Sequence, residues 1–146
     1  MVVVIDANIL ISASLNLKGK IANIIFTNSA KANFVVPTFI LAELKENEVK
    51  ICKESKLTTN EFNKNLLLLL SKIMVINDDE ISNSLFKKAF ELTKLIDPKD
   101  TIYIAMAIAL NALVWTGDLK LLKALKRKGY NHIITTADFQ QILKGI

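Results

Sequence analysis

The chain begins with an unbroken apolar run, Met1 to Ile5, that ends directly at Asp6. The run shows no alternation of polar and apolar residues, which is typical of a β-strand buried on both faces of a parallel sheet. A carboxylate at the end of such a strand is costly to bury unless its charge is compensated. In open α/β sheets, ligands bind beyond the carboxyl ends of the strands, where Asp6 is expected to lie. The opening strand therefore predicts a polar site at the edge of a sheet.

The rest of the chain alternates strand patterns with helix patterns. Further strands are expected at residues 33–37, 74–76, 113–116 and 132–135. Helices are expected at residues 20–30, 38–54, 58–70, 78–95, 97–111, 118–128 and 136–144. This alternation predicts an α/β fold, a three-layer α/β/α sandwich with a mainly parallel central sheet. The sequence has no linker, internal repeat or low-complexity segment, so residues 1–146 are expected to form a single domain.

Composition narrows the functional classes. The only cysteine is Cys52 and the only histidine is His132, which excludes a disulfide framework and leaves too few soft ligands for a structural zinc site. The longest apolar run, residues 102–110, is too short to span a bilayer, and the start of the chain lacks a basic segment typical of signal peptides. We therefore expect a cytoplasmic protein without a membrane partner. The net charge of +5 permits a nucleic-acid partner but fits a merely solvated basic surface equally well.

Four acidic residues fall at positions that a parallel sheet would bring to one edge. Asp6 ends the first strand, and Asp118 follows the 113–116 strand by one glycine. Asp100 falls in the first turn of the 97–111 helix, and Glu43 falls in the second turn of the helix entered from the 33–37 strand. A helix entered from a strand begins at the edge where the strands end. We therefore expect these four carboxylates at one rim of the sheet.

Each of these acids also has a structural explanation. Taken alone, Asp97 and Asp100 are best explained as capping residues of a helix with proline at its first position. Asp118 is a respectable N-cap for the helix that follows it, and a capping role explains it as well as a role in a site does. Glu43 alone would pass as an ordinary helix carboxylate, whereas Asp6 has the weakest structural explanation. The functional interpretation therefore depends on the acids as a set.

Carboxylates brought together repel one another, and their pKa values rise unless a cation lies among them. Because the available ligands are oxygen atoms, the expected cation is a hard one, Mg²⁺ or Mn²⁺. Such an ion orients a phosphate, lowers the pKa of an attacking water and stabilises charge on the leaving oxygen. The set of acids therefore indicates metal-dependent phosphodiester hydrolysis.

Four segments of the chain resemble the PIN-domain nucleases, the family that includes the VapC toxins of prokaryotic toxin–antitoxin pairs. They occur in the family's order and at its usual separations: VIDANILIS at 4–12, PTFILAEL at 37–44, DPKDTIYIAMA at 97–107 and WTGD at 115–118. No single segment is specific, but the ordered set covers nearly the whole chain. The resemblance implies the α/β/α sandwich already predicted from the alternation of strands and helices.

The resemblance also implies roles for individual residues. It makes four acids the ligands of one or two Mg²⁺ or Mn²⁺ ions, and hence the catalytic residues: Asp6, Glu43, Asp100 and Asp118. Asn8 and Thr116 match supporting polar residues of the family, while Asp97 stays open as a further ligand or a helix cap. Many family members carry another acid or amide where this chain has Lys120.

The activity implied by the resemblance is that of a metal-dependent endoribonuclease. It would hydrolyse RNA phosphodiester bonds and leave a 5′-phosphate and a 3′-hydroxyl. In the VapC branch the partner is a protein antitoxin, and homodimers are common among relatives. Basic residues on the 118–128 helix, Lys120, Lys123 and Arg127 among them, are candidates to contact the RNA backbone, although a solvated helix face explains them equally well.

Two alternative functions are compatible with parts of the sequence. A PIN-like domain that has lost catalysis would bind RNA or a protein without cutting, and the presence of all four acids argues against it. A receiver-type phosphoryl-transfer domain has paired acids after its first strand, whereas here Asp6 stands alone. The sequence therefore favours the nuclease.

Overall fold

The computed structural model describes residues 1–146, and its centre is a sheet of five parallel strands. In spatial order the strands are β3 (Met74–Ile76), β2 (Asn33–Pro37), β1 (Val2–Ile5), β4 (Leu113–Trp115) and β5 (Ile133–Ile134). Every neighbouring pair is parallel, with Val4 of β1 opposite Val35 of β2 on one side and Val114 of β4 on the other. The expected mainly parallel sheet is thus confirmed. It is parallel throughout, and β1 is its central strand.

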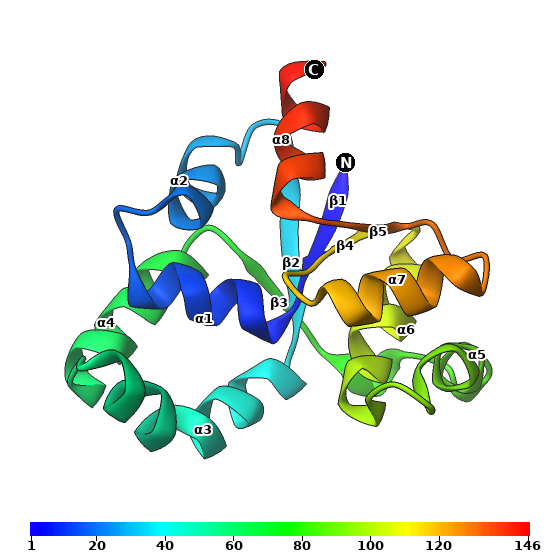
Figure 1. Ribbon diagram of the computed structural model, residues 1–146, viewed down its shortest axis with the longest axis horizontal. Coiled ribbons are helices and arrows are strands. Elements are labelled where there is room, and N and C mark those ends of the chain that lie inside the picture. Colours follow the sequence, from blue (N-terminus) through cyan, green and yellow to red (C-terminus); the bar gives the residue numbers. More distant parts are fainter.

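Eight α-helices surround this sheet: α1 (Ala7–Leu15), α2 (Lys20–Thr27), α3 (Phe39–Ser55), α4 (Thr59–Leu70), α5 (Asn83–Thr93), α6 (Thr101–Leu110), α7 (Leu119–Arg127) and α8 (Thr136–Lys144). Two single 3₁₀ turns, η1 (Asp78–Glu80) and η2 (Pro98–Asp100), precede α5 and α6. In Figure 1, α1 to α4 lie on one side of the sheet and α5 to α7 on the other. This is the predicted three-layer α/β/α arrangement.

The start of the chain contains a helix that the sequence analysis did not predict. α1 begins one residue after β1, because the Asp6 side chain accepts a hydrogen bond from the Ile9 N–H and caps the helix. The helix buries Ile9, Leu10 and Ala13 on one face. This spacing of three to four residues is the signal that could have revealed it.

Two expected helix boundaries are wrong. The 78–95 helix is divided, because Ser82 accepts from the Leu85 N–H and starts α5 afresh after η1. α3 begins within one residue of its expected start, and the Asp78 carboxylate, in η1, accepts from the Phe39 N–H at 2.7 Å. The helix expected at 20–30 ends at Thr27. The remaining helices fall within a few residues of their predicted ends.

The core joins the sheet to α8 through a cluster of aromatic rings. The buried Trp115 ring lies 5.0 Å from the Phe139 ring and 6.2 Å from the Phe34 ring, measured between centroids. Its Nε1–H donates to the Thr136 hydroxyl at 3.0 Å, so the indole is satisfied as well as packed. This packing fixes the end of β4, the strand that leads to Asp118.

No helix is by itself long and apolar enough to cross a membrane. Taken together, α1 and α2 have the length and apolar composition of a membrane span, but they are bent by 102° relative to each other.

Gly129 follows α7 in the left-handed region of backbone space, with a φ of +86°. A Cβ at this position would meet no atom within 4 Å, so an alanine there suffers only from the left-handed backbone. We expect Gly129→Ala to lower the free energy of unfolding by about 1 kcal/mol, measured by urea denaturation. Gly145→Ala is the matched control, because Gly145 has a φ of −84° and should change stability by less than about 0.5 kcal/mol. Equal losses in both variants would contradict the backbone explanation.

Candidate active site

Asp6 lies at the carboxyl end of the central strand and is only 3% exposed. One of its oxygens, Oδ1, accepts from the Ile9 N–H at 3.2 Å, and the other, Oδ2, accepts from the Asn8 amide at 3.1 Å. Burial raises the pKa of Asp6 to about 7, contacts with Thr116, Ile9 and Asn8 oppose the rise, and the charge of Asp118 adds to it. Asp6 is therefore both the N-cap of α1 and a carboxyl group at the sheet edge whose pKa lies near neutral pH.

Asn8 connects the end of β1 to the end of β4. Its amide nitrogen donates to Asp6, while its Oδ1 accepts from the Gly117 N–H at 2.9 Å. A Cβ at position 117 would lie 3.1 Å from the same Oδ1, so glycine permits this close approach. The polar residue singled out after the first acid thus orients Asp6 and fixes the loop that carries Asp118.

Asp118 follows β4 and caps α7, as its sequence position allowed. Its Oδ1 accepts from the Leu121 N–H at 3.1 Å, and its own N–H donates to the hydroxyl of the buried Thr116 at 3.0 Å. The charge of Asp118 raises the pKa values of both Asp6 and Asp100. Asp118 is therefore a helix cap and, at the same time, an electrostatic member of the acidic set.

Asp100 is the acid whose structural explanation is wrong. Although it stands at the N-cap position of α6, its side chain makes no capping hydrogen bond there. Its Oδ2 is buried and has no hydrogen-bond partner. Asp97, by contrast, is exposed and accepts from the Lys99 N–H at 3.0 Å, which gives it the capping role in η2. A buried carboxylate oxygen without a partner is unfavourable unless another ligand satisfies it.

Glu43 lies half-buried on α3, in the turn nearest the end of β2. Its Oε1 accepts from the Tyr103 hydroxyl at 2.8 Å. Burial raises the pKa of Glu43, while the Tyr103 bond and the charge of Lys99 lower it. Burial and the charge of Glu43 raise the pKa of Tyr103, so the phenol stays a donor. Neither Tyr103 nor Lys99 was predicted from the sequence; the signal for Tyr103 was its helical spacing three residues after Asp100.

The electrostatics join the four acids into one set. Burial raises the pKa of Asp100 to about 7, and four other carboxylates add to the rise: Asp97, Asp6, Asp118 and Glu43. Asp100 therefore lies within electrostatic reach of the other three predicted acids and of Asp97, and Asp6 lies within reach of Asp118.

The residues of this set fit a hard cation in their chemistry. All the side-chain donors are oxygen atoms, and the unpaired Asp100 Oδ2 is the group such an ion would satisfy. No three His, Cys, Asp or Glu side chains stand close enough together here to coordinate one ion. The carboxylates would have to close on a cation that they share.

A family model described as the PIN domain matches residues 4–136. The chain belongs to the PIN-domain family. PIN domains are generally nucleases, so membership supports a nuclease. A comparison with curated proteins found no match.

Solved structures share the PIN fold at low sequence identity. VapBC2 from Rickettsia felis, bound to a DNA fragment from its promoter, has a TM-score of 0.69 at 20% identity, over 92% of this chain and 97% of that chain. PAE2754 from Pyrobaculum aerophilum has a TM-score of 0.69 at 17% identity, over 99% and 90%. VapBC-1 from nontypeable Haemophilus influenzae has a TM-score of 0.65 at 19% identity, over 94% and 99%. These likenesses establish the fold of the PIN domain.

The basic residues of α7 follow the candidate site along the chain. The helix buries Leu121, Leu122 and Leu125 against the PIN core and leaves its other face to solvent. The predicted RNA contacts all lie on that exposed face: Lys120, Lys123 and Arg127. Their positions permit contact with a nucleic-acid backbone near Asp118, and their role stays a prediction.

Proposed function

We propose that this PIN domain is an endoribonuclease that depends on Mg²⁺ or Mn²⁺. The observation that carries the proposal is the buried, unpaired Oδ2 of Asp100, whose burial, together with the charges of neighbouring carboxylates, raises its pKa to about 7. A helix cap would explain Asp100 only if its side chain accepted an N–H, and it does not. A shared cation would satisfy that oxygen and offset the repulsion.

Four acids would hold one or two ions: Asp6, Glu43, Asp100 and Asp118. When bound, the cation would activate water and stabilise negative charge on a phosphodiester. Within the chain, Asn8 keeps the Asp6 carboxylate oriented, and the Tyr103 hydroxyl donates to Glu43 and so favours its ionised form. Lys120, Lys123 and Arg127 would bind RNA phosphates through charge, which predicts tighter binding at low salt. The products would carry a 5′-phosphate and a 3′-hydroxyl.

We further propose that the enzyme is the toxin of a toxin–antitoxin pair. Two of the similar structures are VapBC proteins, which supports a protein antitoxin as partner. Expression should arrest growth of a bacterial host, and co-expression of the antitoxin, sought in the adjacent gene, should restore growth. A cytoplasmic location and a homodimer stay predictions that accompany this role.

The first test of the nuclease is cleavage of a pool of RNAs by purified protein with Mg²⁺, Mn²⁺ or EDTA. We expect cutting with either metal and none with EDTA. Asp118→Asn should lose at least about a hundredfold in rate, because asparagine preserves the cap of α7 but removes the charge. Glu91→Gln, an acid-to-amide change on α5 outside the acidic set, is the control and should cut like the unmodified protein.

The other outcomes separate the alternatives. Cleavage that persists in EDTA and in Asp118→Asn would point to a contaminant or to a different site. RNA binding that needs no metal, without cleavage at any metal concentration, would favour a PIN-like module that binds RNA or protein without cutting.

Tyr103→Phe tests the hydrogen bond that holds Glu43. Without the phenol, the pKa of Glu43 should rise further, because that bond lowers it now. We expect cleavage to fall by about tenfold, with a larger loss at pH 6 than at pH 8, measured as a pH–rate profile. Tyr130→Phe is the matched control, because the Tyr130 hydroxyl is buried without a hydrogen-bond partner. If the pH–rate profile of Tyr103→Phe is the same as that of the unmodified protein, the hydrogen bond from Tyr103 to Glu43 does not contribute to cleavage.

A further inference from the structure

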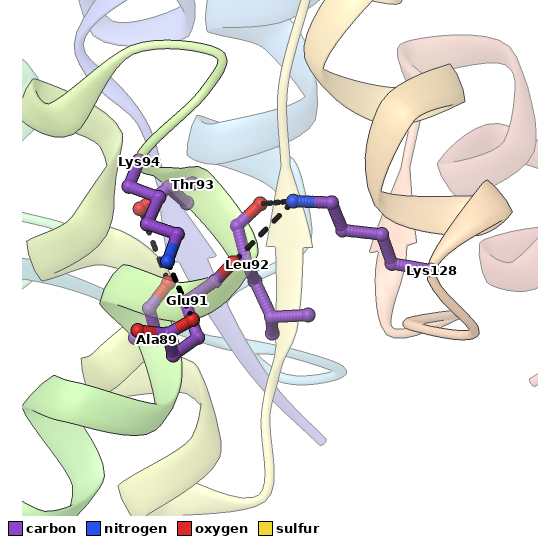
Figure 2. A network of polar contacts seen from close by, with 6 residues as sticks. All are labelled: Ala89, Glu91, Leu92, Thr93, Lys94 and Lys128. Carbon is purple, nitrogen blue, oxygen red and sulfur yellow. Dashed lines mark hydrogen bonds and ion pairs between the residues drawn. The ribbon is translucent and has the colours of Figure 1, made fainter.

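The C-terminus of α5 is closed by a lysine from another helix. Lys128, the residue after α7, donates from its Nζ to the carbonyl oxygens of Glu91 at 3.3 Å and Leu92 at 3.0 Å. Figure 2 shows its extended side chain reaching from the end of α7 to these two carbonyls. The final carbonyls of a helix lack partners within the helix, and a cation there also interacts favourably with the helix dipole. Lys128 therefore caps α5 from outside.

The next residue of α5 is tied to the helix that begins at the acidic set. Thr93 is fully buried, and its hydroxyl donates to the Ala89 carbonyl at 3.1 Å. The Thr101 hydroxyl, also buried, lies 2.6 Å from the Thr93 hydroxyl. A hydroxyl has one proton, so with Thr93 donating to Ala89, Thr101 is the donor in the bond between the two threonines. This bond joins the last turn of α5 to the first residue of α6.

The short segment between these anchors carries two of the acids. The Thr93 carbonyl accepts from the N–H groups of Ile96 at 2.9 Å and Asp97 at 3.1 Å, which folds the segment back on the end of α5. Asp100 immediately precedes Thr101. Its buried Oδ2 has no hydrogen-bond partner, so no hydrogen bond to that oxygen fixes the side chain. The bond between Thr93 and Thr101 therefore constrains the backbone from which Asp100 projects.

Lys128 adds a link to the opposite side of the acidic set. α7 begins at its N-cap Asp118 and ends at Lys128, about 15 Å further along the helix axis. One rigid helix thus presents an acid at one end and, at the other, the ammonium that caps α5. The two segments that supply Asp118 and Asp100 are in this way connected at a distance from the carboxylates themselves.

We propose that Lys128 and the Thr93–Thr101 hydroxyl pair are positioning residues that set Asp100 relative to Asp118 for cation binding. The inference rests on the proposed function, because it assumes that these acids share a cation. It also separates Lys128 from the other basic residues of α7: its ammonium is engaged by α5, so its contribution is to the placement of the acids and not to RNA contact.

The test measures Mn²⁺ affinity of the purified protein by calorimetry, without RNA and without turnover. Thr93→Val keeps the volume but removes the hydroxyl, and we expect the Kd for Mn²⁺ to rise by about tenfold. Thr93→Ser restores the hydroxyl and should stay within about threefold of the unmodified protein. Ser14→Ala removes another buried hydroxyl, one that donates to a carbonyl of α1, and is the control for loss of stability alone. Thermal unfolding of each variant is recorded in parallel.

Lys128→Met provides a second test at an exposed position, where the variant should fold. It keeps most of the side-chain stem but removes the donor, so the Kd for Mn²⁺ should again rise by about tenfold, while Lys128→Arg should largely preserve it. Lys126→Met, two residues earlier on the same helix, removes the same charge without removing a cap and is the matched control. Hydrogen exchange at the amides of Asp97 and Asp100 should accelerate in Lys128→Met and not in Lys126→Met.

The outcomes distinguish this inference from the proposed function. Unchanged Mn²⁺ affinity in both Thr93→Val and Lys128→Met would overturn the positioning role even if the enzyme cuts RNA. The unmodified protein could bind Mn²⁺ without cleaving RNA while both variants bind Mn²⁺ more weakly. That result would support the positioning role and contradict the proposed reaction. If the unmodified protein binds no Mn²⁺, both the positioning role and the proposed function are wrong. Equal losses in Ser14→Ala and Thr93→Val, or in Lys126→Met and Lys128→Met, would reduce the effect to general stability or charge and overturn the inference.

Discussion

Asp6→Asn is expected to lower metal-dependent RNA cleavage by at least about a thousandfold, an increase of about 4 kcal/mol in the activation free energy. Asp6 ends the central strand, is 3% exposed, and is oriented by Asn8 and by the first turn of α1. Asparagine can still cap that turn, so the fold should persist. It cannot supply the negative charge that a hard cation requires. The loss is therefore electrostatic and specific to the site.

Single-turnover rates at saturating Mn²⁺ would measure this effect, since they isolate the chemical step from product release. Asp138→Asn is the control: it makes the same change at the start of α8, in an exposed capping box outside the acidic set. Asp138→Asn should cut at close to the unmodified rate. If Asp6→Asn retains more than about a third of the rate, the reaction does not depend on the carboxylate at the end of β1.

The sheet could be predicted from sequence because each strand carries its signal locally. An apolar run such as Val2 to Ile5 is readable without any knowledge of its neighbours, and the alternation with helices then implies parallel pairing. The α1 helix was missed because the strand pattern runs almost directly into it: only Asp6 separates the end of β1 from the start of α1. The Asp78 carboxylate that accepts from the first N–H of α3 is distant in sequence, so no local pattern reports that bond.

The candidate site was predictable in its acids and not in its contacts. The edge position of Asp6, Glu43, Asp100 and Asp118 follows from where parallel strands end. The Tyr103 bond to Glu43 and the Asn8 bond to Gly117 join residues 60 and 109 positions apart, and only the assembled fold brings such residues together. The capping explanation of Asp100 likewise needed coordinates, because N-cap position and N-cap hydrogen bond differ here. Sequence thus identified the candidate ligands, whereas structure identified the residues that orient them.

The same change that removes activity should stabilise the cation-free protein above neutral pH. Burial raises the pKa of Asp6 from 3.8 to about 7, so between these values the folded chain binds a proton that the unfolded chain lacks. The free energy of unfolding must then fall as pH rises through this window, and the full penalty is present above pH 7. Asp6→Asn has no such penalty, so its advantage should be absent near pH 4, grow between pH 4 and 7, and level off above.

A pKa shift of this size corresponds to about 4 kcal/mol in the free energy of unfolding. The NH₂ group of the new asparagine would face the Asn8 donor, which offsets part of this gain. We therefore expect the free energy of unfolding to rise by about 2 kcal/mol at pH 8. Urea denaturation in EDTA at pH 5 and pH 8 measures the gain. Asp138→Asn should behave in the opposite way, because hydrogen bonds with Thr135 lower the pKa of Asp138 and its charge stabilises the folded chain above its unfolded pKa. An Asp6→Asn variant that is less stable than the unmodified protein at pH 8 would mean that the carboxylate is satisfied without a cation. In that case the acidic edge would be a structural feature of this PIN domain and not a site under electrostatic strain.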